Sequence, residues 1–172
     1  DDTHWEFLNG KDDACSTDAL LNWLGNTPSK PFFAMLWTYQ THYPYFFQGE
    51  EKQYDTNDPV FNRYLNAMHH SDQQIGRILS GLEKLHIDDS TLVVVVGDHG
   101  EAFGQHGQTT HASAIYEENV HIPCLFINPA ITFSRRKASG GLVDLAPTFF
   151  QILGKEWPTF WQGRSLLSKG VN

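Results

Sequence analysis

The chain has 172 residues, a formal net charge of −8 and a hydrophobic fraction of 40%. This length can bury one core, so we expect one domain or part of one, and the composition is typical of a globular rather than a disordered chain. The acidic balance argues against a nucleic-acid-binding surface, and the single basic run, residues 135–137, is better explained as a solvated loop or hairpin.

The two cysteines, Cys15 and Cys124, are too few for a disulfide scaffold. Cys124 lies in an apolar run that reads as a strand, so we expect a buried free thiol there. The sequence has no apolar run long enough to span a membrane and no signal-peptide pattern at its start. It opens at Asp1 without an initiator methionine, and we therefore expect a processed protein or an excised piece.

In the first third of the chain, the pattern predicts one helix, one strand and one long loop. Ser16 or Thr17 would cap a helix that ends at Leu24. The apolar segment 31–38 reads as a strand buried on both faces. Residues 39–58 are polar and aromatic, and loops of that length are usually functional or mobile.

The longest periodic segment runs from about Pro59 to Leu85 and predicts a helix with one apolar face. Asp58-Pro59 is a good start for it, because proline suits the first helical turn. Asp72 interrupts the apolar stripe, and we expect a partly buried carboxylate paired with a neighbour, with a metal ligand as the alternative. The apolar stripe consists of Phe61, Leu65, Met68, Ile75, Leu79 and Leu82.

The most informative stretch is 91–101, where four consecutive valines are followed by Gly97, Asp98 and His99. The valines read as a strand buried in a sheet covered by helices, and ligands gather at the carboxyl ends of such strands. A carboxylate and an imidazole are good ligands for a divalent metal, and glycines at 97 and 100 let the backbone approach a ligand closely. The alternative is a polar turn in which Asp98 caps a following helix.

The rest of the chain continues the alternation of strands and helices. A loop spans 101–111, a short helix is expected around 113–119, and a third strand spans 121–128. A helix from about 142 to 153 follows and is closed by Gly154. This order predicts an α/β fold with a largely parallel sheet covered by helices.

Three histidines follow predicted strands and are candidates for substrate contact. His42 follows the segment 31–38, and His106 and His111 follow the Asp98-His99 pair. A histidine near a metal can donate a hydrogen bond to an anionic oxygen or protonate a leaving group. We interpret the histidines at 4, 69, 70, 86 and 121 as surface or packing residues.

Several motifs occur in a fixed order along the chain. They are Thr-His-Tyr-Pro-Tyr at 41–45, Tyr64…Asp72…Ile75-Gly76, Gly-Asp-His-Gly-Glu at 97–101, Phe-Gly-Gln-His-Gly at 103–107, Ile-Tyr-Glu-Glu-Asn at 115–119, Ile122-Pro123 and Val-Asp-Leu-Ala-Pro-Thr at 143–148. This ordered set resembles the sulfatase branch of the alkaline phosphatase superfamily over nearly the whole chain. The branch includes arylsulfatases, phosphonate monoester hydrolases, and lipoteichoic-acid and phosphoethanolamine transferases, and the resemblance implies an alkaline-phosphatase-like fold.

The resemblance also implies roles for the candidate residues. Asp98 and His99 correspond to ligands of the catalytic metal, a divalent ion such as Ca, Mn, Zn or Mg. His42 corresponds to the histidine that contacts the sulfate or phosphate group. His106 and His111 correspond to residues near the substrate, with roles that vary among branches.

The chain departs from the family pattern in its nucleophile. Sulfatases carry a Cys-x-Pro-Ser-Arg motif in the N-terminal half, and transferases use a threonine there; neither Cys15 nor Cys124 has the required neighbours. Thr41, Thr109 and Thr110 are candidates on position alone, without support from the family. We therefore expect residues 1–172 to be the C-terminal part of a sulfatase-like catalytic domain, which binds metal poorly and is inactive by itself.

For the intact protein the resemblance implies metal-dependent hydrolysis of sulfate esters. The alternatives are a phosphoglycerol or phosphoethanolamine transferase or a phosphodiesterase of the same superfamily, and a non-catalytic binding module. The expected partners are a small-molecule, lipid or glycan ester and the missing N-terminal half of the domain. Self-association through an exposed sheet edge is also expected, and a periplasmic, extracellular or membrane-anchored location is favoured over a cytoplasmic one.

Overall fold

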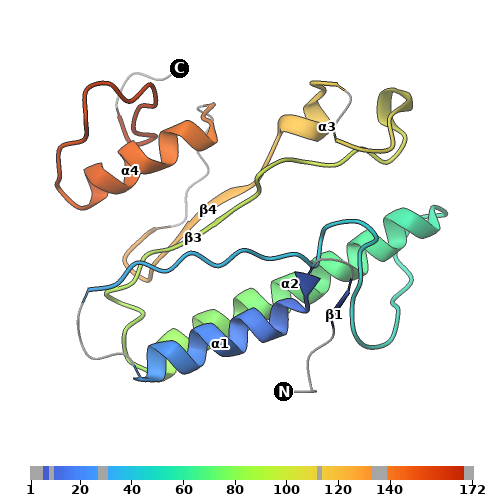
Figure 1. Ribbon diagram of the computed structural model, residues 1–172, viewed down its shortest axis with the longest axis horizontal. Helices are drawn as coiled ribbons and strands as arrows, with labels where there is room; N and C mark the ends of the chain where they lie inside the picture. The colour runs from blue at the N-terminus through green and yellow to red at the C-terminus, as the bar shows by residue number, and fades with distance from the viewer. Residues whose placement is uncertain (1–5, 8–9, 27–30, 112–113, 133–138, 169–172) are drawn as a thin grey trace.

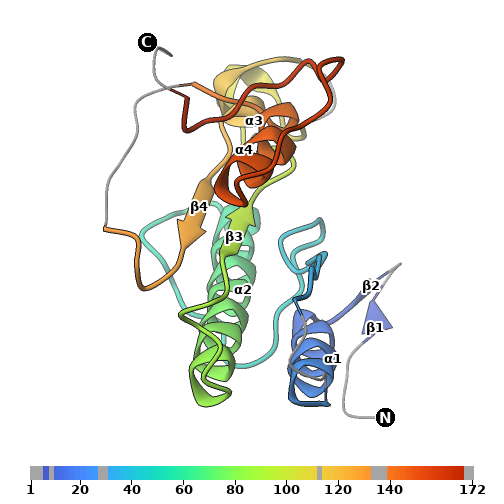
Figure 2. The same ribbon diagram turned by 90° about the vertical axis from the view of Figure 1, so that its left-hand side faces the viewer.

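The computed structural model describes residues 6–7, 10–26, 31–111, 114–132 and 139–168 (Figure 1). The long helices α1 and α2 lie on one side of a two-stranded ribbon, β3–β4, and α4 lies on the other side (Figures 1 and 2). The basic run 135–137, His4 and the predicted start of a helix at residue 113 lie outside the described residues. The α/β class predicted from the sequence is confirmed, and α1 and α2 form a layer against one side of the ribbon.

The first helix begins earlier than the sequence pattern predicts. A short antiparallel pair, β1 (Glu6–Phe7) and β2 (Gly10–Lys11), precedes α1, which spans Asp13–Asn26 rather than starting at residue 16 or 17. The side chain of Asp12 accepts a hydrogen bond from the N–H of Ala14 at 2.8 Å, so this carboxylate satisfies a free donor of the first turn. The predicted cap was therefore wrong by one turn.

The second helix, α2 (Pro59–Lys84), forms where the periodicity predicts it. Its cap is Asp58, which accepts hydrogen bonds from the N–H groups of Val60 at 2.8 Å and Phe61 at 3.2 Å. Asp72 is exposed, so the expectation of a partly buried carboxylate was wrong.

The most buried face of α2 carries more polar residues than the predicted stripe. Asn62 and Asn66 both donate side-chain hydrogen bonds to the carbonyl of Lys52, at 3.1 and 2.9 Å. The loop before the helix therefore folds back over it and buries amides that a helical periodicity alone assigns to solvent. The buried residues of α2 are Asn62, Asn66, Ala67, His70, Gln74 and Leu82.

The valine strand pairs differently from the expectation. Strand β3 (Val93–Val96) lies antiparallel to β4 (Cys124–Ile127), with Val93 opposite Ile127 and Val96 opposite Cys124. Both strand pairs in the described residues are antiparallel, whereas the sequence predicted a largely parallel sheet. The valines are half-buried or exposed, and Cys124 is a free but exposed thiol rather than a buried one.

Segment 31–38 was predicted as a strand buried on both faces, and this prediction was wrong for the chain as described. The segment is extended and pairs with neither β3 nor β4, and it runs in the same direction as β3 in Figure 1. The side chains of Phe33, Met35 and Trp37 are 80%, 79% and 75% exposed. Apolar side chains exposed to this extent in one short segment normally lie against another part of a protein.

The remaining elements follow the predicted order. They are a short turn η1 (Gln105–Gly107), α3 (Glu117–Val120), η2 (Leu142–Asp144) and α4 (Leu145–Ile152). Asp144 joins η2 to the chain that follows α4, because its carboxylate accepts hydrogen bonds from the N–H groups of Gly141 at 2.9 Å and Arg164 at 2.8 Å. None of the helices in the described residues combines the length and apolar character that crossing a bilayer requires.

Replacing the cap of α2 tests how this helix is held. In the full-length protein that contains this chain, Asp58→Ala should lower the free energy of unfolding by about 1 kcal/mol, because two N–H groups lose their acceptor. Urea denaturation measures the change. Asp58→Asn keeps a side-chain oxygen and should cost less, and an equal loss in both variants would contradict the capping interpretation.

Candidate active site

Asp98 and His99 leave β3 as an exposed pair of metal-type ligands. The N–H of His99 donates to Asp98 Oδ1 at 3.0 Å, and His99 Nδ1 donates to the carbonyl of Gly100 at 2.8 Å. This second bond places a proton on Nδ1, so in the neutral ring Nε2 carries the lone pair, and this atom lies 3.8 Å from Asp98 Oδ1. Because metal–oxygen and metal–nitrogen bonds are each about 2.0–2.2 Å for zinc, both atoms can reach one ion.

The two ligands do not make a complete site within the described residues. No group of three or more histidine, cysteine, aspartate or glutamate side chains there could hold a metal ion. The donor set of Asp98 and His99 therefore fits a divalent ion chemically but supplies only part of its coordination, since a catalytic zinc usually has three protein ligands.

The turn that carries these ligands is docked closely on α3. The N–H of Gly100 donates to the carbonyl of Asn119 at 2.9 Å. A Cβ on residue 100 would lie 2.0 Å from the backbone oxygen of Glu118, so only glycine fits at this position. The close approach fixes how the backbone leaves β3, and with it the direction of the Asp98 and His99 side chains.

His111 lies against His99. Its ring stacks on that of His99 with centroids 3.8 Å apart and planes at 25°. His111 Nδ1 donates to the carboxylate of Glu101, with distances of 3.2 and 3.3 Å to the two oxygens. The sequence-predicted residues His99 and His111 are thus brought together, and His111 Nε2 is left available for another contact.

Glu101 also reaches the turn that carries His42. The hydroxyl of Tyr45 donates to Glu101 Oε2 at 3.2 Å. Tyr45 is 3% exposed, and its pKa is raised above the usual range by burial, with the negative charge of Glu101 as the next cause. Tyr45 also has a φ of 63°, a left-handed conformation that costs a non-glycine residue energy and that occurs often at functional sites.

His42 is exposed and is oriented by its own turn. Its N–H donates to the carbonyl of Tyr39 at 3.0 Å, and its carbonyl accepts from the N–H of Tyr45 at 2.8 Å. The imidazole stacks on the Tyr39 ring at 4.6 Å, and its Nδ1 donates to the carbonyl of Tyr43 at 2.7 Å. In the described residues no hydrogen bond or ring contact joins His42 to Asp98 or His99, so the link runs through Tyr45 and Glu101.

His106 is held at the α3 side of the site and not against the other histidines. Its Nδ1 donates to Glu118 Oε1 at 2.9 Å, and this hydrogen bond lowers the pKa of Glu118. The ring lies flat on Tyr116, with centroids 4.1 Å apart and planes at 8°. Its place next to α3 makes it a more peripheral candidate than His111.

Glu101 and Tyr45 are members of the site that were not predicted from the sequence. Both belong to ordered motifs, at 97–101 and 41–45, and the Glu101 carboxylate could have been noted as a further polar group beside the Asp98-His99 pair. Their roles depend on a contact between residues 56 positions apart, which spacing along the chain does not show.

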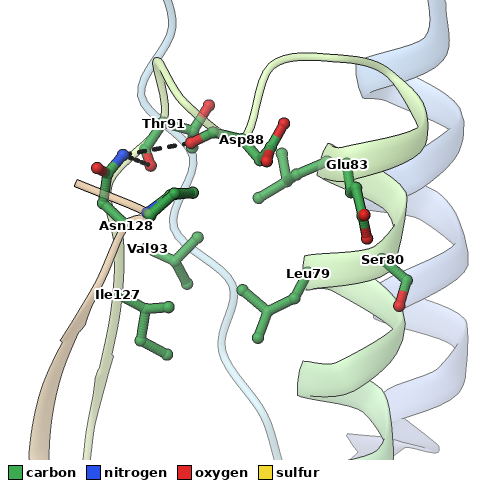
Figure 3. Close-up of a pocket in the computed structure, with 10 residues that line it drawn as sticks. Leu79, Ser80, Glu83, Asp88, Thr91, Val93, Ile127 and Asn128 are labelled. Atoms are coloured by element: carbon green, nitrogen blue, oxygen red, sulfur yellow. Dashed lines mark hydrogen bonds between the residues drawn. The ribbon is translucent and has the colours of Figure 1, made fainter. Parts of the chain in front are cut away.

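A cavity of about 330 Å³ lies away from this site (Figure 3). Leu79 of α2 faces Val93 and Ile127 of the β3–β4 ribbon across it, and Asn128 Nδ2 donates to the carbonyl of Thr91 at 3.0 Å at its rim. Because these residues lie at the start of β3, the cavity is at the opposite end of the strand from Asp98.

The close approach at Gly100 gives a direct test of how the ligand-bearing turn is held. In the full-length protein, Gly100→Ala should lower the free energy of unfolding by about 1–3 kcal/mol, because the new methyl group collides with backbone. Gly97→Ala is the matched control, since a Cβ there makes an ordinary contact of 3.4 Å with Ile122. Equal losses for the two variants in urea denaturation would show that the docking of residue 100 is unimportant.

Comparison with known proteins places these features in a family. The sequence profile of the sulfatase family matches residues 2–155. Mouse arylsulfatase K is 35% identical over 99 residues, which is 57% of this chain and 18% of that protein. The Haloferax volcanii low-salt glycan biosynthesis sulfotransferase Agl7 is 32% identical over 140 residues, which is 73% of this chain and 34% of that protein.

The fold agrees with the sequence comparison. A crystal structure of an alkaline phosphatase superfamily protein from Vibrio parahaemolyticus superposes with a TM-score of 0.70 and 21% identity, covering 95% of this chain and 39% of that one. The chain thus spans well under two thirds of each of these proteins. The resemblance predicted from the ordered motifs is confirmed: the chain belongs to the sulfatase family, and its fold is similar to that of an alkaline phosphatase superfamily protein.

Proposed function

We propose that this chain is the C-terminal part of the catalytic domain of a metal-dependent sulfate ester hydrolase. The observation that carries the proposal is the exposed pair at the end of β3, where Asp98 Oδ1 and His99 Nε2 lie 3.8 Å apart and His99 Nδ1 is bonded to the carbonyl of Gly100. The similarity to arylsulfatase K supports sulfate esters as the substrate class. The similarity to a protein named for glycan biosynthesis makes a sulfated glycan one candidate within that class.

Asp98 and His99 would supply two of the protein ligands to a divalent ion such as Ca, Mn, Zn or Mg. When bound, the ion supplies positive charge that screens the nucleophile from the ester oxygens. Asp98 contributes negative charge to that coordination, and His99 contributes a neutral nitrogen whose orientation is fixed by its bond to the carbonyl of Gly100.

The histidines would bind the ester and assist the leaving group. His42 and His111 each use Nδ1 for an internal hydrogen bond, to the Tyr43 carbonyl and to Glu101, so each presents Nε2 outward. An outward Nε2 contacts a sulfate oxygen as a donor when it is protonated, and it then transfers that proton to the departing oxygen. His106 would act at the edge of the substrate, since its Nδ1 is bonded to Glu118 on α3.

The nucleophile and the remaining metal ligands would come from other parts of the full-length protein. The exposed apolar segment 31–38 supports this, because Phe33, Met35 and Trp37 gain burial when another part of the domain covers them. In the isolated chain the same surface and the open edges of the ribbon favour self-association. A further relative, from Drosophila melanogaster, is named as an extracellular sulfatase homologue, and this similarity supports a location outside the cytoplasm.

The proposal is tested in the full-length protein with an aryl sulfate substrate. Asp98→Ala and His99→Ala should each lower kcat/KM by about 100-fold or more, because outer partners of metal ligands alone cost about 10–100-fold. His42→Ala should lower it by about 100-fold or more, the usual contribution of a general acid. His121→Ala is the matched control, since its side chain is exposed and pairs with Glu117 rather than with a residue of the site.

The same assay includes a phosphodiester and decides between the members of the superfamily. Faster turnover of the aryl sulfate, lost in Asp98→Ala, supports the sulfatase. Turnover of the phosphodiester alone would contradict the sulfatase proposal and indicate a phosphodiesterase or a phosphoryl-group transferase. Full activity in Asp98→Ala would show that catalysis does not depend on this site, and the interpretation of this chain as a non-catalytic binding module would then be favoured.

The isolated 172-residue chain provides a separate prediction. Titration calorimetry with Zn²⁺ or Ca²⁺ should show weak binding, and no hydrolysis of the aryl sulfate should be measurable, because two protein ligands and no nucleophile do not make a catalytic site. Hydrolysis by this chain that disappears in Asp98→Ala would prove that it carries a complete site.

A further inference from the structure

Two neighbouring carboxylates at the start of α1, Asp12 and Asp13, are each 1% exposed. Asp12 bonds to its own helix and to α2: its Oδ1 accepts from the N–H of Ala14 at 2.8 Å and from His70 Nε2 at 3.1 Å. Asp13 bonds in a different direction, toward the turn that carries His42. The two side chains are thus equally buried but have separate partners.

Asp13 holds the backbone of residues 39 and 40. Its Oδ1 accepts from the N–H of Tyr39 at 2.7 Å, and its Oδ2 accepts from the N–H of Gln40 at 3.3 Å and from Ser71 Oγ at 3.1 Å. Burial raises the pKa of Asp13, while the hydrogen bonds from Tyr39 and Gln40 lower it. Burying a carboxylate costs free energy, which the hydrogen bonds from two loop N–H groups offset here. These bonds also fix the position of the loop.

Gln40 completes the clamp from the side of the turn. It is fully buried, its Oε1 accepts from the N–H of Asp13 at 3.2 Å, and its Nε2 donates to the carbonyl of Phe46. One side chain therefore ties both ends of the turn to α1. Figures 1 and 2 both show the start of α1 next to the chain that follows segment 31–38.

His42 depends on the residues that this clamp fixes. Tyr39 accepts the N–H of His42 at its carbonyl, 3.0 Å away, and carries the ring on which the imidazole stacks. Asp13 bonds to the N–H of the same tyrosine. Because the His42 side chain is itself exposed, the direction of its Nε2 is set by the turn and not by surrounding core.

We propose that Asp13 is a positioning residue for His42, acting through the backbone of Tyr39 and Gln40, while Asp12 serves the packing of α1 on α2. The inference rests on the proposed function, in which His42 contacts the sulfate ester. It adds a residue 29 positions away in sequence that never touches the substrate. Holding a catalytic group in place matters because a displacement of about 1 Å can cost about 100-fold in rate.

Asp13→Asn in the full-length protein is the main test. The amide keeps the size of the side chain and one oxygen acceptor, but its nitrogen cannot accept a bond from backbone, so one loop N–H loses its partner. We expect kcat on the aryl sulfate to fall about 10- to 100-fold with KM changed less than about threefold. Amide hydrogen exchange at residues 39 and 40 should become at least about 10-fold faster.

Asp12→Asn is the matched control, because it changes an adjacent and equally buried carboxylate. Asp12→Asn and Asp13→Asn should lower the thermal midpoint of unfolding by similar amounts. Asp12→Asn should nevertheless leave kcat within about twofold and the amide exchange of residues 39 and 40 unchanged. A fall in kcat that is equal in the two variants, or a normal kcat in Asp13→Asn, overturns the positioning role.

Two further variants keep the test decisive. If Asp13→Asn does not fold, Ser71→Ala removes one of the three side-chain acceptor bonds of Asp13 and should lower kcat about two- to fivefold; an unchanged kcat overturns the inference. If His42→Ala retains full activity, the proposed role of His42 fails, whereas the exchange rates at 39 and 40 still report whether Asp13 holds the turn.

Discussion

The carboxylate of Glu101 is the interaction on which the candidate site depends, because it joins the two loops that carry its histidines. One oxygen accepts from the Tyr45 hydroxyl at 3.2 Å, and both oxygens lie within 3.3 Å of His111 Nδ1. The Glu101 side chain is only 13% exposed, so these bonds are made in surroundings where charge-assisted hydrogen bonds are stronger than in water. Without this carboxylate, the chain that follows β3 would be linked to the 41–45 turn mainly by the ring contact of Tyr45 with Phe103.

Much of the fold could be predicted because it is encoded locally. The periodicity and the Asp58-Pro59 start define α2, the valine run defines β3, and the ordered motifs identify the family. Local patterns do not fix the partner of a strand, and this explains the errors. Segment 31–38 has the composition of a central strand, but Phe33 and Trp37 are exposed because the segment joins neither sheet of the described residues.

The errors at polar residues have a different cause, which is long-range hydrogen bonding. Asp12 is held at the start of α1 by His70, which lies 58 positions later, while Asn62 and Asn66 are buried because the loop at Lys52 covers them. In the site, the Asp98-His99 pair could be read from the sequence, since two good ligands follow a strand. Glu101 could not, because its role depends on Tyr45, which lies 56 positions earlier.

The described part of the site is acidic, so an anionic ester needs added positive charge in order to bind there. The described site residues include three carboxylates, those of Asp98, Glu101 and Glu118, and no lysine or arginine, while the chain carries a formal net charge of −8. Such a surface repels a sulfate group unless positive charge is added. In the proposed function, a divalent ion at Asp98 and His99 supplies that charge, and His42 and His111 add outward nitrogens as donors. The described part of the site therefore fits an anionic substrate only with added positive charge, and under the proposed function a bound metal would serve substrate binding as well as chemistry.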